Sequence, residues 1–175
     1  TDTMAALATD KIVALTSPQI ATLTDKQLAS ISSAQLAAFG TGQIAALTAK
    51  QIVSISTDAI VGLTSNQTAV LSATQLAAIT TAQLEAFTTA NIAALTSTQV
   101  GSLTAAQIGT LDAGELNSFT TDEIAALNVK SLAGLTTETL AALATNKIVA
   151  LTNPQIATLT DKQLASISSA QLAAF

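Results

Sequence analysis

The sequence predicts an all-α fold, a superhelical solenoid of about 22 short helices with one helix for each eight-residue repeat. Two observations lead to this prediction. Polar and apolar residues recur with a period of eight along the whole chain, and each repeat carries the residues that begin a helix. We number the positions of each repeat, or octad, as slots zero to seven, with slot zero at residues whose numbers are multiples of eight.

The slots differ sharply in composition. Slot zero is Thr, Ser, Asp or Asn in 18 of its 21 occurrences, and slot three is Gln or Glu in 15 of 22. Slot four is a large apolar residue in 21 of 22 octads, with Thr68 as the exception, and slot seven is Leu, Ile or Phe in all 22. Each octad therefore supplies one capping position, one amide or carboxyl position and two core positions.

The octad that begins at Thr16 shows how these slots start a helix. Gln19 follows Thr16 at the spacing of a capping box, in which the threonine hydroxyl accepts from the backbone N–H of slot three and the glutamine reaches back to the threonine N–H. Leu15 and Ile20 flank the cap at the spacing of a hydrophobic staple. Both features recur in successive octads, so each octad is expected to start a new helix.

A single long helix and a β-strand both fail to explain the period. At about 100° per residue, eight residues overshoot two turns by about 80°, so the apolar stripe of a long helix would spiral around its axis. Slots four and seven would lie on opposite faces of a strand. We therefore expect helices of about seven residues, about 10 Å long. Helices this short are unstable alone and need neighbouring octads.

The chain also contains a longer repeat. Residues 7–39 recur as residues 143–175 with 31 of 33 positions identical, the changes being Asp10 to Asn146 and Ser17 to Asn153. The offset of 136 residues equals 17 octads, an odd number, which favours equivalent positions on one screw over alternating helical hairpins. Residues 1–175 are thus expected to form a single repeat array, cut from a longer tandem protein.

Taken in order, most octads fit the pattern. Pro18 and Pro154 lie in the first helical turn, where a missing N–H is tolerated. Gly40 and Gly42 mark the softest expected joint, because Gly40 replaces the capping residue. Capping boxes are expected to weaken over residues 112–138, where slot three is occupied by Glu115, Glu123 and Ser131 and the next slot three is Thr139.

The composition argues against most chemistry. The chain has no His, Cys, Tyr or Trp, and its six basic residues are all Lys. We expect no enzyme activity and assign no catalytic, cofactor-binding or metal-binding residue and no cofactor. The net charge of −5 and the scattered Lys argue against nucleic-acid binding. A polar cap interrupts almost every octad, so no membrane span is expected. The expected partners are neighbouring octads of the same chain, and self-association is left open.

Two features of the sequence also have a functional interpretation. The only concentration of acidic residues offers oxygen ligands for a weak Ca²⁺ site, although acidic residues also suit helix N-termini and capping boxes. It consists of Asp112, Glu115, Asp122, Glu123 and Glu138. The regular Thr spacing also suggests an ice-binding face, but capping should occupy the slot-zero hydroxyls. We favour the structural interpretation for both features.

The run Ile79-Thr80-Thr81-Ala82-Gln83-Leu84-Glu85-Ala86-Phe87-Thr88 resembles LTxxQIAALT-type octad repeats of very large secreted or surface bacterial proteins, which are adhesin-like. The resemblance covers the whole chain and brings no catalytic residues with it. It implies an extracellular or cell-surface location. The sequence thus predicts a structural spacer, stalk or matrix segment, and the alternative is a scaffold that recognises a protein or glycan through its groove or outer face.

Overall fold

The computed structural model describes residues 2–175, with side chains from Met4 onward. Within these residues the regular structure consists of 21 α-helices and one 3-10 helix, with no strand, which confirms the predicted all-α solenoid. The chain divides into two compact units, the first ending at Ala94 and the second spanning Leu95–Phe175. Each unit is described by itself.

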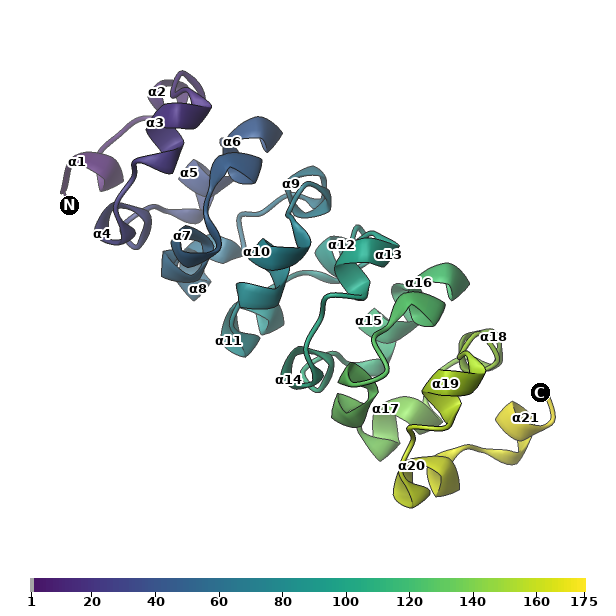
Figure 1. Ribbon diagram of the computed structural model, residues 1–175. Helices are drawn as coiled ribbons and strands as arrows, with labels where there is room; N and C mark the ends of the chain where they lie inside the picture. The colour runs from purple at the N-terminus through teal and green to yellow at the C-terminus, as the bar shows by residue number, and fades with distance from the viewer. Residues whose placement is uncertain (1) are drawn as a thin grey trace. The chain divides into compact units, whose positions relative to one another are not determined.

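The first unit contains twelve helices, one in each octad (Figure 1). They are α1 (Asp2–Ala5), α2 (Thr9–Val13), α3 (Ser17–Ala21), α4 (Asp25–Leu28), α5 (Ser33–Ala37), α6 (Thr41–Ala46), α7 (Ala49–Ser54), α8 (Thr57–Ile60), α9 (Ser65–Ala69), α10 (Ala73–Ala78), α11 (Thr81–Glu85) and α12 (Thr89–Ile92).

The second unit continues the same plan with nine α-helices and the 3-10 helix. They are α13 (Ser97–Val100), α14 (Ala105–Ile108), α15 (Ala113–Ser118), α16 (Thr121–Ala126), η1 (Ser131–Gly134), α17 (Thr137–Ala141), α18 (Thr145–Ile148), α19 (Asn153–Ile156), α20 (Asp161–Ser166) and α21 (Ser169–Leu172).

The helices have four to six residues and are shorter than the seven expected, because more than the capping residue is extended. Thr48 at slot zero has φ −74° and ψ 159°. Leu47, at slot seven before it, is also extended, with φ −66° and ψ 139°. The sharp turn between helices therefore uses ordinary extended geometry, and no described residue has a positive φ.

Helices pack against the helix three octads away, and not chiefly against their neighbours in sequence. In the first unit the pairs run from α1 with α4 and α2 with α5 through to α9 with α12, and Figure 1 shows α7 beside α10. In the second unit α13 packs on α16, α14 on η1 and α17 on α20. This constant offset is the arrangement expected of equivalent octads on a screw and differs from stacked hairpins.

The core is thin and built from slots four and seven. The slot-four residues Ile20, Leu28 and Ile44 are completely buried, and the slot-seven residues Leu47 and Ile55 expose 3% and 2% of their surface. Burial of each such side chain contributes about 1.5–3 kcal/mol. Since one octad contributes only two, its stability depends on the hydrogen bonds described next.

Candidate functional site: a buried ladder of glutamine side chains

The capping boxes form as predicted, and the octad of α10 is representative. The Ser72 hydroxyl accepts a hydrogen bond from the Gln75 N–H at 3.1 Å, and the Gln75 Oε1 accepts from the Ser72 N–H at 2.7 Å. Gly40 was expected to form a soft joint, yet its octad keeps half of the box, because its N–H donates to the Gln43 Oε1 at 2.7 Å. The following helix, α6, is among the longest in the first unit.

The Gln75 side chain makes a second set of bonds that the capping box does not require. Its Nε2 donates to the carbonyl oxygen of Ile44 at 3.0 Å and to that of Leu47 at 2.6 Å. These carbonyls belong to slots four and seven of the octad four positions earlier, on the adjacent turn of the unit. The side chain is only 3% exposed, so one carboxamide joins a helix start to the preceding turn.

This contact recurs in both units, and we call the set of residues that make it the glutamine ladder. The Nε2 atoms lie 2.6–2.8 Å from the slot-seven oxygen and 2.9–3.3 Å from the slot-four oxygen. The ladder comprises Gln35, Gln43, Gln51, Gln67, Gln75 and Gln83 in the first unit and Gln155, Gln163 and Gln171 in the second.

The ladder defines the superhelix within each unit. An octad packs on the octad three positions away and hydrogen-bonds to the one four positions earlier. One superhelical turn therefore contains between three and four octads. The pattern copies at a larger scale the neighbour relations of an α-helix, in which residues three and four apart are in contact.

Sequence reasoning missed the ladder, although a signal for it was present. A capping box accepts Gln or Glu at slot three, yet 13 of the 15 such residues are Gln. The carboxylate of Glu only accepts hydrogen bonds, whereas the carboxamide of Gln also donates two. The preference for Gln thus indicates that slot three must donate to something other than the cap.

Two departures from the octad pattern form one buried pair. Thr68, the polar exception at slot four, is completely buried, and Asn91 occupies a slot three. The Nδ2 of Asn91 donates to the Leu63 carbonyl at 2.9 Å and to the Thr68 Oγ1 at 3.0 Å. Asn is one methylene shorter than Gln, so the Thr68 hydroxyl accepts the bond that a more distant carbonyl would otherwise take. The Thr68 hydroxyl in turn donates to the Thr64 carbonyl at 3.1 Å.

In a second departure, two residues replace one glutamine, one as the donor to the preceding turn and the other as the acceptor for the cap N–H. In the octad of α18 the cap is Ala144 and slot three is Lys147. The Lys147 Nζ donates to the Phe119 carbonyl, at the same 28-residue offset as the ladder. Lysine cannot accept the cap N–H, and Asn117 does so instead, with its Oδ1 2.8 Å from the Ala144 nitrogen.

A third departure pairs a small slot-three residue with glycine at slot six. Ala59 is followed by Gly62, and Ser131 by Gly134. A Cβ on Gly62 would overlap the Ser33 carbonyl, and one on Gly134 would overlap the carbonyl of the equivalent residue in its own unit. At these two octads the two turns thus approach until backbone meets backbone, and only glycine permits this.

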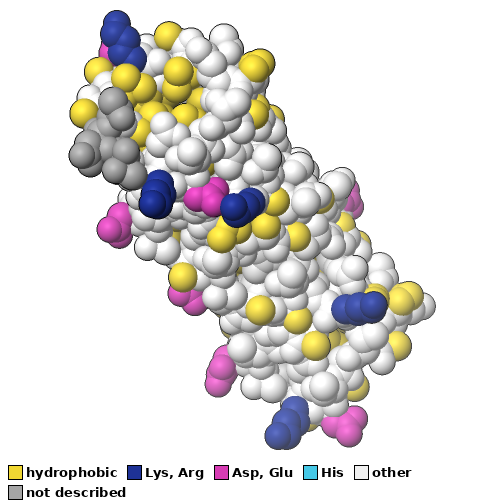
Figure 2. Space-filling model, turned by 60° about the vertical axis from the view of Figure 1, so that its left-hand side comes forward, with side chains coloured by type: hydrophobic (Ala, Val, Ile, Leu, Met, Phe, Trp, Pro, Cys, Tyr) yellow, Lys and Arg dark blue, Asp and Glu magenta, His cyan; other side chains and the backbone are white. Residues whose placement is uncertain are grey.

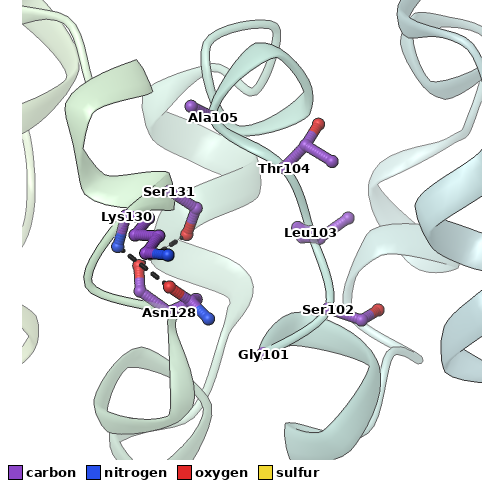
Figure 3. A pocket seen from close by; sticks show the side chains of 8 residues that line it. All are labelled: Gly101, Ser102, Leu103, Thr104, Ala105, Asn128, Lys130 and Ser131. Atoms are coloured by element: carbon purple, nitrogen blue, oxygen red, sulfur yellow. Dashed lines mark hydrogen bonds between the residues drawn. The ribbon is translucent and has the colours of Figure 1, made fainter.

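An open cavity of about 420 Å³ lies beside one of these sites (Figure 3). The Lys130 N–H donates to the Asn128 Oδ1 at 2.9 Å, and the Ser131 hydroxyl donates to the Asn128 carbonyl at 2.7 Å. The cavity is lined by Gly101, Ser102, Leu103, Thr104, Ala105, Asn128, Lys130 and Ser131.

The acidic residues considered for Ca²⁺ lie at helix starts. Asp112 accepts from the Glu115 N–H at 2.8 Å, and the Glu123 carboxylate accepts from the Thr120 N–H at 2.7 Å. These two capping boxes are intact, contrary to the expected weakening. The two octads that follow, which begin at Asn128 and Thr136, have no Gln or Glu at slot three and form no capping box. From Met4 onward no group of three or more His, Cys, Asp or Glu side chains is placed to hold a metal ion.

The slot-three carboxyl of Glu115 has an altered pKa. Burial raises the pKa of Glu115 above its ordinary value, and the Asp112 carboxylate adds to the rise, although the bond from the Asp112 N–H opposes it. Burial therefore penalises the charged form of Glu115 at this slot.

Charged side chains are dispersed over the face shown in Figure 2. The ion pair between Lys50 and Asp25 spans 2.7 Å and joins helices three octads apart in the first unit. The hydrogen bond from Lys50 lowers the pKa of Asp25. In the described part of the chain, every helix is too short and too interrupted by polar residues to cross a membrane.

These features define a class of protein, an all-α repeat protein whose octads are joined by buried side-chain amides. Residues 76–113 match the model of the ALTTAQ repeat family. The family description corresponds to the run Ala78-Ile79-Thr80-Thr81-Ala82-Gln83, which extends from slot six to slot three. The match supports a repeat family, and its description states no activity. The comparison with curated proteins found no match.

Proposed function

We propose that the chain is a structural spacer, a stalk or matrix segment of a giant tandem-repeat bacterial protein outside the cell. The observation that carries this proposal is that the recurring slot-three amides are buried and do not face solvent. The slot-three amides that would otherwise recognise a ligand are buried and bind the chain's own backbone, as Gln75 does. The most regular part of the sequence thus serves the fold.

The exposed slots support the same function. The two changes between residues 7–39 and 143–175 replace Asp10 with Asn146 and Ser17 with Asn153, and all four residues are exposed. A spacer tolerates drift on its surface because its job depends on length and stability. A binding face would hold those positions fixed.

A spacer also needs a length that is set by repeat number. Within each unit the octads pack on octads three positions away, and the octads of the ladder also bond to octads four positions earlier, so an added regular octad repeats the same contacts. Stability and length should therefore grow by similar increments with each octad. The extracellular bacterial setting rests on the resemblance to secreted and surface repeat proteins.

The test is a copy-number series in the parent protein. Removing or duplicating the 136-residue repeat should change the separation of the flanking segments in proportion, measured by distance labels, and leave their individual activities unchanged. An antibody against the array should label intact cells. Loss of a specific binding activity on removal of one copy, with separation unaffected, would show that the repeat is not a spacer.

The second candidate is a scaffold that recognises a protein or glycan. One observation favours it, the cavity lined by Leu103, Asn128 and Ser131. Substitutions that fill this cavity should abolish recognition if the scaffold function is correct and should leave a pure spacer fully functional.

A further inference from the structure

The cavity beside Ser131 lies at a position where the ladder lacks its amide. At the offsets found elsewhere, a glutamine at position 131 would donate to the carbonyls of Leu103 and Val100, which are 28 and 31 residues earlier. Ser131 donates instead to the Asn128 carbonyl at 2.7 Å. No side chain in residues 2–175 donates to the Leu103 or Val100 carbonyl.

The capping residue of the same octad also lacks its usual hydrogen-bond partner. In regular octads the slot-zero N–H donates to the glutamine Oε1, as the Ser72 N–H does to Gln75. Here slot zero is Asn128, and its N–H has no hydrogen-bond acceptor among the described residues. Asn128, Leu103 and Ser131 all line the cavity.

Figure 3 shows the two walls of the cavity. In this view the side chains of Leu103 and Thr104 lie on the side of their segment away from Asn128 and Ser131. The segment of Leu103 forms one wall and Asn128 with Ser131 lies on the other, around about 420 Å³, which is within the range of small-molecule sites.

We propose that this cavity binds a primary carboxamide, the group that the ladder supplies in other octads. A primary carboxamide has one N–H donor for the carbonyl of Leu103, which lines the cavity, and one oxygen to accept from the Asn128 N–H. Its second N–H takes the direction that the ladder offset gives toward the Val100 carbonyl, which lies outside the lining. The ligand class is the side chain of an Asn or Gln residue of a polypeptide, or a small primary amide. Lys130 on the cavity wall disfavours a cationic donor. The proposal is independent of the spacer function and stands or falls separately from it.

The test uses propanamide as the probe and nuclear magnetic resonance of the whole chain. Propanamide should cause saturable shifts at the backbone amides of Leu103, Asn128 and Ser131. N,N-dimethylpropanamide keeps the acceptor and lacks both donors, and propanoate is an anion without donors. Neither should shift these amides. Equal shifts with the dimethyl compound, or stronger ones with propanoate, would overturn the proposal, the latter by indicating an anion site at Lys130.

Two variants at one position sharpen the test. Ser131→Gln supplies the missing amide from the chain itself and should weaken propanamide binding at least about tenfold. Ser131→Ala removes the hydroxyl, leaves the cavity open and should bind as the parent chain does. Unchanged binding by folded Ser131→Gln contradicts the proposal. If that variant does not fold, the comparison of the three probes on the parent chain still decides.

Discussion

Gln75→Glu separates the two roles of a ladder residue, because the carboxylate keeps the acceptor for the Ser72 N–H and loses both donors. The bonds lost are those to the Ile44 carbonyl at 3.0 Å and the Leu47 carbonyl at 2.6 Å. A protonated Glu keeps one donor, so below about pH 4 the variant should lose one net hydrogen bond, about 1 kcal/mol.

At neutral pH the loss should be much larger. The buried site and its two carbonyl oxygens disfavour the charged form, so the folded pKa of the new carboxyl lies above its unfolded value. The folded state then binds more protons than the unfolded state, and stability falls as pH rises from the unfolded pKa through the folded one. The variant can avoid a buried charge by keeping the new carboxyl protonated in the folded state. Protonating at pH 7 a group whose ordinary pKa is about 4.3 costs about 3.7 kcal/mol, which is the upper limit of the extra cost. The total loss at pH 7 is then about 4–5 kcal/mol.

The assay is urea unfolding followed by circular dichroism at pH 4 and pH 7. The matched control is Gln19→Glu, because the Gln19 Oε1 accepts from the Thr16 N–H at 2.8 Å and its Nε2 donates to no acceptor among residues 2–175. The control should lose little at either pH. Equal losses for the two variants, or a Gln75→Glu loss that does not depend on pH, would refute the ladder as a source of stability.

Three further predictions follow from the departures and from the altered carboxyl. Thr68→Ile and Asn91→Gln should each cost about 1–3 kcal/mol alone, because the first removes the acceptor of an Asn91 donor and the second places a longer side chain against the buried Thr68, and the double variant should recover most of that loss in a double-mutant cycle. Gly62→Ala should destabilise by about 1–3 kcal/mol, because the new methyl group meets backbone, whereas Gly42→Ala, with nothing within 4 Å, should stabilise its helix by about 0.5–1 kcal/mol in thermal unfolding. Glu115→Gln should raise the melting temperature at pH 7 but not near pH 4, because the raised folded pKa makes the native charged form unfavourable only above the ordinary pKa of Glu; an equal gain at both pH values would contradict this cause.

The helix starts were predictable because they depend on local chemistry. Thr24 and Gln27 stand three residues apart, and capping needs nothing beyond that spacing. The number of octads per superhelical turn was not predictable. It depends on how closely the small residues at slots five and six allow neighbouring turns to approach, and on how far a glutamine side chain extends toward the preceding turn. The sequence alone therefore gave no reason to connect Gln75 with Leu47.

The departures from the pattern show the same limit. Thr68 stands out in the sequence as the polar residue at an apolar slot, and Asn91 as a shortened amide. Pairing them requires the 23-residue offset between a slot four and the slot three packed on it, which follows only from the superhelix. Likewise, Asn117 lies at an ordinary slot five and has no local feature that identifies it as the acceptor for the Ala144 N–H.

The central claim is that the slot-three amide donates to the preceding turn of the superhelix. The most direct measurement is hydrogen exchange of the side-chain amide protons of Gln75 and Gln19, followed by nuclear magnetic resonance. The Gln75 Nε2 protons, bonded at 3.0 and 2.6 Å to Ile44 and Leu47, should exchange only when the turn opens, orders of magnitude more slowly than those of Gln19. Exchange of the Gln75 amide at the rate of the Gln19 amide would contradict the claim.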